Sequence, residues 1–207
     1  MKQSTRLALV TSGPTRHSIF ANFPELATHL GPIRATSPRT ASRAAKVLGG
    51  GWGASGWPEV LAADLIAIQT AGPKLFAEMQ GLGANALTDR VLLACDAQAD
   101  LRQLTQLEGL GANLVQLFTL NPREPLVALS GEGFGVTRAR RLLASAGIRC
   151  LTIRDGAGPR LLAAVTELEE AIAAALHRAD QSFVFAGLKR PEARMVGVGT
   201  AIRALRR

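Results

Sequence analysis

The stretch LALVTSGPTRHSIF, from Leu7 to Phe20, has the pattern of a buried strand that leads through a tight turn into a helix. Its first residues are apolar, and Ser12–Pro14 supplies the turn. A dinucleotide-binding turn carries several glycines, because the backbone must turn sharply and approach a pyrophosphate closely. On the G-x-G-x-x-G spacing the three positions here are Thr11, Gly13 and Arg16, so only the middle one is glycine.

This turn is nevertheless a candidate anion site. Free backbone N–H groups and the helix dipole attract a phosphate at the start of a helix. Arg16 stands where the helix should pack closely on the strand, so it is equally compatible with a closed site. Both alternatives remain open. The candidate cofactor-binding residues of the turn are Thr11, Ser12, Gly13, Pro14, Thr15 and Arg16, with further donors at His17 and Ser18.

The end of the second strand is a second cofactor feature. An acidic residue there would bind the ribose of NAD, whereas basic and hydroxyl groups suit the extra phosphate of NADP. The sequence IRATSPRTASR, residues 33–43, contains no acid. Thr36, Ser37, Arg39 and Arg43 therefore favour NADP over NAD. In the alternative interpretation, Ser37 caps a helix and the two arginines lie one turn apart on its solvent side.

Outward from these segments, strand-like and helix-like stretches alternate along the chain. The alternation predicts an α/β fold, a doubly wound and mostly parallel sheet of about eight strands with helices on both faces. Thr70 follows one of these strands and is also a candidate cofactor residue. The predicted strands are 7–10, 33–36, 64–69, 90–95, 113–120, 125–130 and 148–153, and the predicted helices are 20–30, 38–48, 73–83, 99–111, 133–147 and 159–180.

The chain is long enough for one large domain with an appendage, and 47% of its residues are hydrophobic. We expect residues 1–155 to form the nucleotide-binding domain and residues 156–207 to form a short helical segment. The helix Pro159–Asp180 is the longest predicted. From Gln181 onward the pattern indicates a loop and one basic helix after Pro191.

The glycine-rich stretch GGGWGASGW, Gly49–Trp57, predicts a mobile loop. Its tryptophans allow two interpretations. Trp52 and Trp57 could fold over a bound nucleotide, or their indoles could pack on the domain.

Composition excludes several function classes. The formal net charge is +8, but tyrosine is absent and aromatics make up only 4%, so nucleic acid is not the expected partner. No apolar run approaches a membrane span and no secretory signal is present, which predicts a cytoplasmic protein.

Cys95 and Cys150 lie in apolar runs without metal-ligand spacing, so we expect buried free thiols. The histidines His17, His29 and His177 make no metal pattern with carboxylates.

Asp96 and Asp100 follow a predicted strand at the edge where open α/β sheets bind ligands. Capping of the next helix by Asp96 explains one of them without a function.

A family resemblance rests on LALVTSGPTRHSIF, ATSPRTASRAAKVLG, ADLIAIQTAGP, and the segments 90–122 and 125–153. Their order resembles a family of Rossmann-like proteins with a C-terminal DUF2520 domain, related to 6-phosphogluconate and β-hydroxyacid dehydrogenases and to pyrroline-5-carboxylate reductases. The resemblance implies an NAD(P)-binding Rossmann-like domain, a helical C-terminal part that builds a homodimer, and reduction of a small-molecule substrate.

The chain departs from that family in two places. Where relatives carry LHPLQTF, this chain has LFTLNPREP, so Phe118 or Thr119 takes the histidine position. In the long helix the polar acid/base candidates are Glu167, Glu169 and Glu170, which on an amphipathic helix usually face solvent. The helical part is also shorter than in the family. The sequence thus predicts an NADP-dependent oxidoreductase with a degenerate cofactor loop and unassigned catalytic residues. The alternative is a non-catalytic ligand-sensing or scaffolding module.

Overall fold

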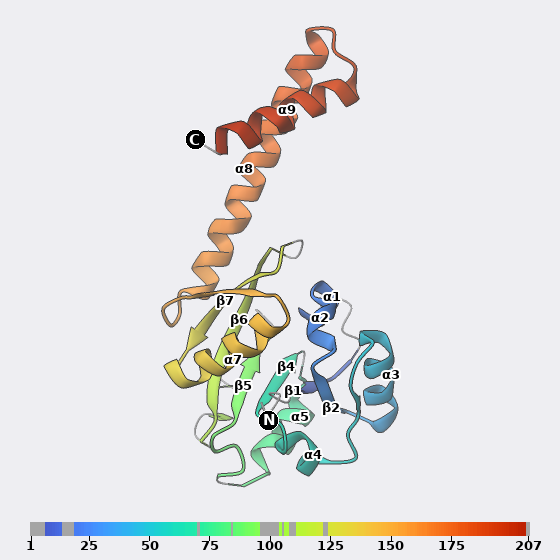
Figure 1. The fold of residues 1–207 in the computed structure, drawn as a ribbon, viewed down its shortest axis with the longest axis vertical. Coiled ribbons are helices and arrows are strands. Elements are labelled where there is room, and N and C mark those ends of the chain that lie inside the picture. The colour runs from blue at the N-terminus through green and yellow to red at the C-terminus, as the bar shows by residue number, and fades with distance from the viewer. Residues whose placement is uncertain are drawn as a thin grey trace. The chain divides into compact units, whose positions relative to one another are not determined.

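The structure, a computed structural model, describes residues 7–13, 19–69, 71–83, 85–95, 104, 106–107, 111–121 and 124–205. The chain divides into two compact units, Met1–Pro159 and Arg160–Arg207. The first unit carries the sheet and the second is a helical hairpin (Figure 1).

The first unit is built on one eight-stranded sheet with the order β3-β2-β1-β4-β5-β6-β7-β8. Neighbouring strands are parallel except for the antiparallel pair β6 and β7. The predicted mostly parallel α/β sheet is therefore confirmed. The strands are β1 Leu7–Thr11, β2 Leu30–Ala35, β3 Trp52–Gly53, β4 Leu65–Gln69, β5 Val91–Ala94, β6 Asn113–Asn121, β7 Leu126–Gly131 and β8 Arg149–Thr152.

Strand β1 is the centre of this unit. Leu7 and Leu9 belong to one hydrophobic cluster and Ala8 and Val10 to another, because successive strand residues point to opposite faces of the sheet. Strand order reverses between β1 and β4, which makes their carboxyl ends the topological switch point where such sheets bind ligands. The helices of this unit are α1 Ile19–Asn22, α2 Pro24–Ala27, α3 Pro38–Leu48, α4 Trp57–Leu61, α5 Pro73–Gln80 and α7 Gly133–Ser145.

The first predicted helix, over 20–30, is wrong in its extent. Two short helices, α1 and α2, replace it, with Phe23 between them in an extended conformation. Pro24 starts α2 because proline lacks the N–H that a continuous helix would need and restricts the residue before it. Strand β2 begins at Leu30, which pairs with Leu7, and so includes the Gly31–Pro32 pair that the sequence placed outside the strand. The predicted helix over 99–111 lies largely outside the described residues.

The stretch Gly49–Trp57, predicted as a mobile loop, contains β3 and the start of α4. The Trp52 indole N–H donates to Glu59 Oε2 at 3.3 Å, and the Trp57 indole N–H donates to Glu78 Oε2 at 3.2 Å. Trp57 packs against a hydrophobic cluster of the domain, whereas Trp52 is 55% exposed although its indole is hydrogen-bonded. Hydrogen bonds from the Ser55 side chain and backbone, and from Trp52, hold the pKa of Glu59 below its usual value.

A second carboxylate, Glu78 of α5, joins three elements. Arg34 of β2 donates to Glu78 Oε2 at 2.7 Å and stands 5.8 Å from the centroid of the Trp57 ring. The Glu78 side chain is 27% exposed, so solvent screens the pair only partly. The hydrogen bond from Arg34 lowers the pKa of Glu78, and burial opposes this shift.

We expect Glu78→Gln to destabilise the protein by about 1 kcal/mol at pH 7. The folded state favours the ionised carboxylate of Glu78. The contribution of Glu78 to the free energy of unfolding is therefore fully present above its ordinary pKa near 4.5. It is lost as the pH falls through the lower pKa of the folded state. Urea unfolding at pH 7 and pH 3 measures the effect. An equal difference between wild type and variant at both pH values would contradict the assignment.

The second unit consists of α8, Gly158–Phe185, which extends into it from the first unit, and α9, Arg190–Leu205. The predicted helix ended at Asp180. It continues to Phe185 because Phe183 packs near Gly197 of α9, and Gly187 then reverses the chain with a φ of 97°. Among the described residues, no helix combines the length and apolar character that a bilayer span requires.

Candidate cofactor site

The candidate site begins where β1 ends. Thr11 is fully buried, and its Oγ1 donates to the Gly13 carbonyl at 3.2 Å. The Gly72 N–H, in front of α5, donates to Ser12 Oγ. Among the described residues, a Cβ built on Gly13 would meet no atom within 4 Å. Side-chain hydrogen bonds thus fix the start of the turn, and no described residue fills the space beside Gly13.

Helix α3 supplies the second part of the site. The Thr40 N–H donates to Ser37 Oγ at 3.1 Å, so Ser37 is the N-cap, and Pro38 occupies the first helical turn. The sequence had left capping by Ser37 as one of two interpretations. Arg39 lies in this first turn and Arg43 one turn further along, and both are exposed.

A pocket of about 260 Å³ joins these two parts. Ser12 and Gly13 line it from the β1 turn, and Arg39 and Arg43 line it from α3. Neither guanidinium has a carboxylate partner among the described residues. Both cations are therefore available to an anion. The remaining lining residues are Thr40, Ala44 and Val47.

Other sequence candidates are not found in this pocket. Ser37 does not line it. Pro14, Thr15, Arg16, His17, Ser18, Thr70, Asp96 and Asp100 lie outside the described residues.

Sequence reasoning missed Gln69, the last residue of β4. It is 5% exposed and pairs in register with Thr11. Its Oε1 is buried without a hydrogen-bond partner in the described part of the chain, a state that costs about 1–3 kcal/mol. The available signal was a polar residue that ends an otherwise apolar strand at the ligand-binding edge. Gln69 therefore offers a free acceptor there.

At the position where the resembling family has histidine, the structure places apolar packing. Phe118 in β6 is 5% exposed. A Cβ built on Gly158, at the start of α8, would lie 2.0 Å from Phe118 Cζ. The adjacent Thr119 is partly exposed. Phe118 is a core residue of the first unit and offers no proton to a substrate.

The remaining titratable candidates are separate from the pocket. No group of His, Cys, Asp and Glu side chains within the described segments could hold a metal ion. Cys95 and Cys150 are half-buried rather than fully buried as expected, and the Cys95 thiol donates to the Leu93 carbonyl oxygen at 3.4 Å. Burial raises the pKa of the Cys150 thiol, with a smaller opposing effect of Arg140. The glutamates of α8 are exposed, as expected; they are Glu167, Glu169 and Glu170.

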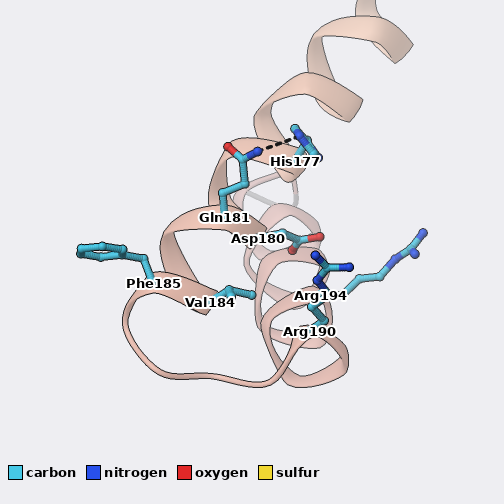
Figure 2. Close-up of a pocket in the computed structure, with 7 residues that line it drawn as sticks. All are labelled: His177, Asp180, Gln181, Val184, Phe185, Arg190 and Arg194. Carbon is cyan, nitrogen blue, oxygen red and sulfur yellow. Dashed lines mark hydrogen bonds between the residues drawn. The ribbon is translucent and has the colours of Figure 1, made fainter.

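A larger hollow of about 550 Å³ lies in the second unit. His177 and Gln181 of α8 are joined by a 3.0 Å hydrogen bond, and Arg190 and Arg194 reach the hollow from α9 (Figure 2). Neither arginine has an ion pair within the described segments. The side chain of Phe185 projects away from the others and is 95% exposed. The hollow is thus lined by two arginines and the carboxylate of Asp180, next to an exposed aromatic ring.

The sequence matches no known protein family and no curated protein. Solved structures do resemble the fold. A pyrroline-5-carboxylate reductase from Coxiella burnetii is 12% identical with a TM-score of 0.64, covering 99% of this chain and 79% of that chain. An imine reductase from Aspergillus terreus, in complex with NADPH4, is 17% identical with a TM-score of 0.66 over 99% and 74%.

A third similar structure is the pyrroline carboxylate reductase of Plasmodium falciparum with NADP bound. It is 11% identical with a TM-score of 0.62, covering 98% of this chain and 78% of that chain. At these identities the likeness concerns the fold, which is Rossmann-like. The relation to DUF2520 proteins stays a prediction.

Proposed function

We propose that this protein binds NADP(H) at the carboxyl ends of β1 and β2 and acts as an NADP-dependent oxidoreductase on a small metabolite. The observation that carries the proposal is the pocket that brings Ser12 and Gly13 together with Arg39 and Arg43. The fold likeness to reductases solved with NADP-type cofactors supports it.

The groups present fit the two phosphate regions of such a cofactor. Two unpaired guanidiniums one turn apart can form charge-assisted hydrogen bonds to a phosphate dianion. NADH carries a hydroxyl in place of that phosphate, so the arginines give it no comparable interaction. No described residue fills the space beside Gly13, so the backbone there can approach the pyrophosphate.

Gln69 gives the site a further acceptor. A hydroxyl or carboxamide N–H of the bound cofactor would satisfy its buried Oε1. Bound NADPH would supply a hydride to the substrate. The roles we assign to the chain are to hold phosphate at Arg39 and Arg43 and to orient the cofactor at Gln69. The turn is degenerate in that buried Thr11 takes the place of the first glycine of the motif.

Calorimetric titration in phosphate-free buffer tests the proposal, with NADH and ATP as controls. We expect micromolar binding of NADPH and weaker binding of NADH. Absence of heat with all three ligands would contradict a cofactor site and would favour a closed turn.

We expect Arg39→Ala and Arg43→Ala each to weaken NADPH binding about tenfold, because each removes a charge-assisted contact to phosphate. Binding of NADH should change little. Lys46→Ala is the matched control, since Lys46 is an exposed cation of the same helix that does not line the pocket. Equal losses of affinity for NADPH and for NADH would show that the two arginines do not contact the 2′-phosphate.

A non-catalytic ligand-sensing or scaffolding module is the second candidate function. The burial of Phe118 against Gly158 favours it, because an apolar ring stands where the resembling family has histidine. NADPH binding without turnover on a panel of imines and hydroxyacids would support the non-catalytic module. Any measurable NADPH oxidation that depends on substrate would support the oxidoreductase.

We also propose that the protein is a cytoplasmic homodimer assembled through α8. The hairpin exposes large apolar side chains that a second copy could cover, including Leu168 at 59%, Met195 at 72% and Phe185 at 95%. Sedimentation of the full chain tests this, with a mass of two chains expected. A single-chain mass at all concentrations would contradict the dimer.

A further inference from the structure

The hollow of the second unit is built from one face of each hairpin helix. Four of its lining residues recur on α8 at helical spacing and so share a face: His177, Asp180, Gln181 and Val184. Arg190 and Arg194, one turn apart, line it from α9. Its volume of about 550 Å³ is that of an ordinary small-ligand site, and it shares no residue with the candidate cofactor pocket.

The two arginines of the hollow oppose each other. Residues four apart on a helix have Cβ atoms about 5–6 Å apart, and like charges at this spacing are unfavourable. Neither guanidinium has an ion pair among the described residues. Both side chains extend on the side of Asp180, away from Phe185 (Figure 2). Two carboxylates joined by a short carbon chain would match the spacing and neutralise both cations.

Asp180 gives the hollow one charge of the opposite sign. Its Oδ1 atom is buried without a hydrogen-bond partner in the described part of the chain, and a Cβ built on Gly197 of α9 would lie 3.2 Å from this oxygen. A carboxylate held against a helix in this way is costly unless a cation stands on its open side. No described arginine forms an ion pair with Asp180. The carboxylate is therefore available to a cationic group of a ligand.

We propose that this hollow binds a small amino acid with two carboxylates, such as glutamate or aspartate. The two carboxylates lie at Arg190 and Arg194, and the ammonium group lies at Asp180. The lining carries two positive charges and one negative charge, so it matches the three charges of this ligand one for one. His177 and Gln181 are hydrogen-bonded to each other at 3.0 Å, which leaves recognition to the charged groups.

The charge pattern predicts which related molecules bind poorly. Glutarate has both carboxylates of glutamate and no amino group, so it would leave Asp180 without a cation. Glutamine has the size of glutamate and a single carboxylate, so it would leave one arginine without an anion. This inference does not depend on cofactor binding by the first unit.

Calorimetric titration of the full chain with L-glutamate, in phosphate-free buffer, tests the inference. We expect saturable binding with a dissociation constant of about 0.1–1 mM, and about tenfold weaker binding of both glutarate and L-glutamine. Absence of saturable binding with L-glutamate and L-aspartate would overturn the site. Equal binding of glutamate and glutarate would show a site for anions alone and would overturn the assignment to an amino acid.

Variants of the hollow locate the ligand. Arg190→Gln and Arg194→Gln should each weaken L-glutamate binding about tenfold. Both residues are exposed, so these variants should fold. Arg178→Gln is the matched control, because Arg178 is an exposed cation of α8 that does not line the hollow. Unchanged binding in both arginine variants would overturn the placement.

Asp180→Asn tests the position of the ammonium group. It should weaken L-glutamate binding about tenfold and leave glutarate binding undiminished, because only glutamate presents a cation to this side chain. A general distortion of the hairpin would weaken both ligands. Equal losses for the two ligands, in a variant that still folds by circular dichroism, would therefore overturn the role of Asp180. If the variant does not fold, the arginine variants and the ligand comparison decide the inference.

Arg39→Ala separates the hollow from the cofactor pocket. It should bind L-glutamate as the wild type does, because Arg39 does not line the hollow. Loss of glutamate binding in Arg39→Ala would place the amino acid in the cofactor pocket and overturn the inference. A wild-type protein that binds glutamate and no NADPH would contradict the proposed function and support the hollow as an independent site.

Discussion

Replacing Gly50 by alanine should destabilise the protein by about 3 kcal/mol, because the added methyl group has no space. A Cβ at this position would lie 2.0 Å from the Ala27 carbonyl oxygen and 2.8 Å from its carbon. Both are backbone atoms at the end of α2, so no side-chain rotation can relieve the clash. The connection from α3 to β3 or the end of α2 must move instead.

Urea or thermal unfolding measures this effect, with a decrease in melting temperature of about 6–12 °C expected. Gly133→Ala is the control, because a Cβ there meets nothing within 4 Å and alanine favours the start of α7. Equal stability of the two variants would mean that the glycine stretch can shift freely, as a mobile loop would.

The same contact links stability to the candidate site. Gly49 ends α3 in the left-handed conformation, with a φ of 71°, and Gly50 follows against α2. This close approach fixes the end of the helix that carries Arg39 and Arg43. We therefore expect any NADPH affinity lost in Gly50→Ala to come from displacement of α3.

The parts of the fold that the sequence predicted are those with strong local signals. Continuous apolar strands and their glycine or proline boundaries identified the main parallel strands, and Ser37 before Pro38 identified a helix cap. Parallel topology also explains why the β1 turn and the start of α3 meet in one pocket, since the carboxyl ends of neighbouring parallel strands share one edge.

The parts that the sequence did not predict depend on contacts between distant residues. The glycines at 49–51 suggested mobility, but Gly50 is required because Ala27 lies against it. Gln69 carried no motif, and its importance appears only when its oxygen is found buried without a partner in the described structure. The sequence aligns Phe118 with a family histidine, but it does not show that the Phe118 ring packs on Gly158, because the two residues are far apart in the chain.

The largest energetic coupling should be found between Phe118 and Gly158. Gly158→Ala should cost about 2–3 kcal/mol through overpacking against the ring, although alanine alone would favour the first turn of α8. Phe118→Ala should cost about 3–5 kcal/mol by leaving a cavity. In the double variant the new methyl group occupies space that the ring has left, so the combined loss should be smaller than the sum by about 1 kcal/mol or more.

A double-mutant cycle in urea unfolding measures this coupling. Additive losses would show that the ring moves away from Gly158 at little cost. In that case Phe118 would be a replaceable side chain, and Phe118→His could restore a proton donor without loss of stability. A strong coupling energy would show that the Phe118 ring is required for packing at the start of α8. Any acid that this protein uses in catalysis must then come from another residue.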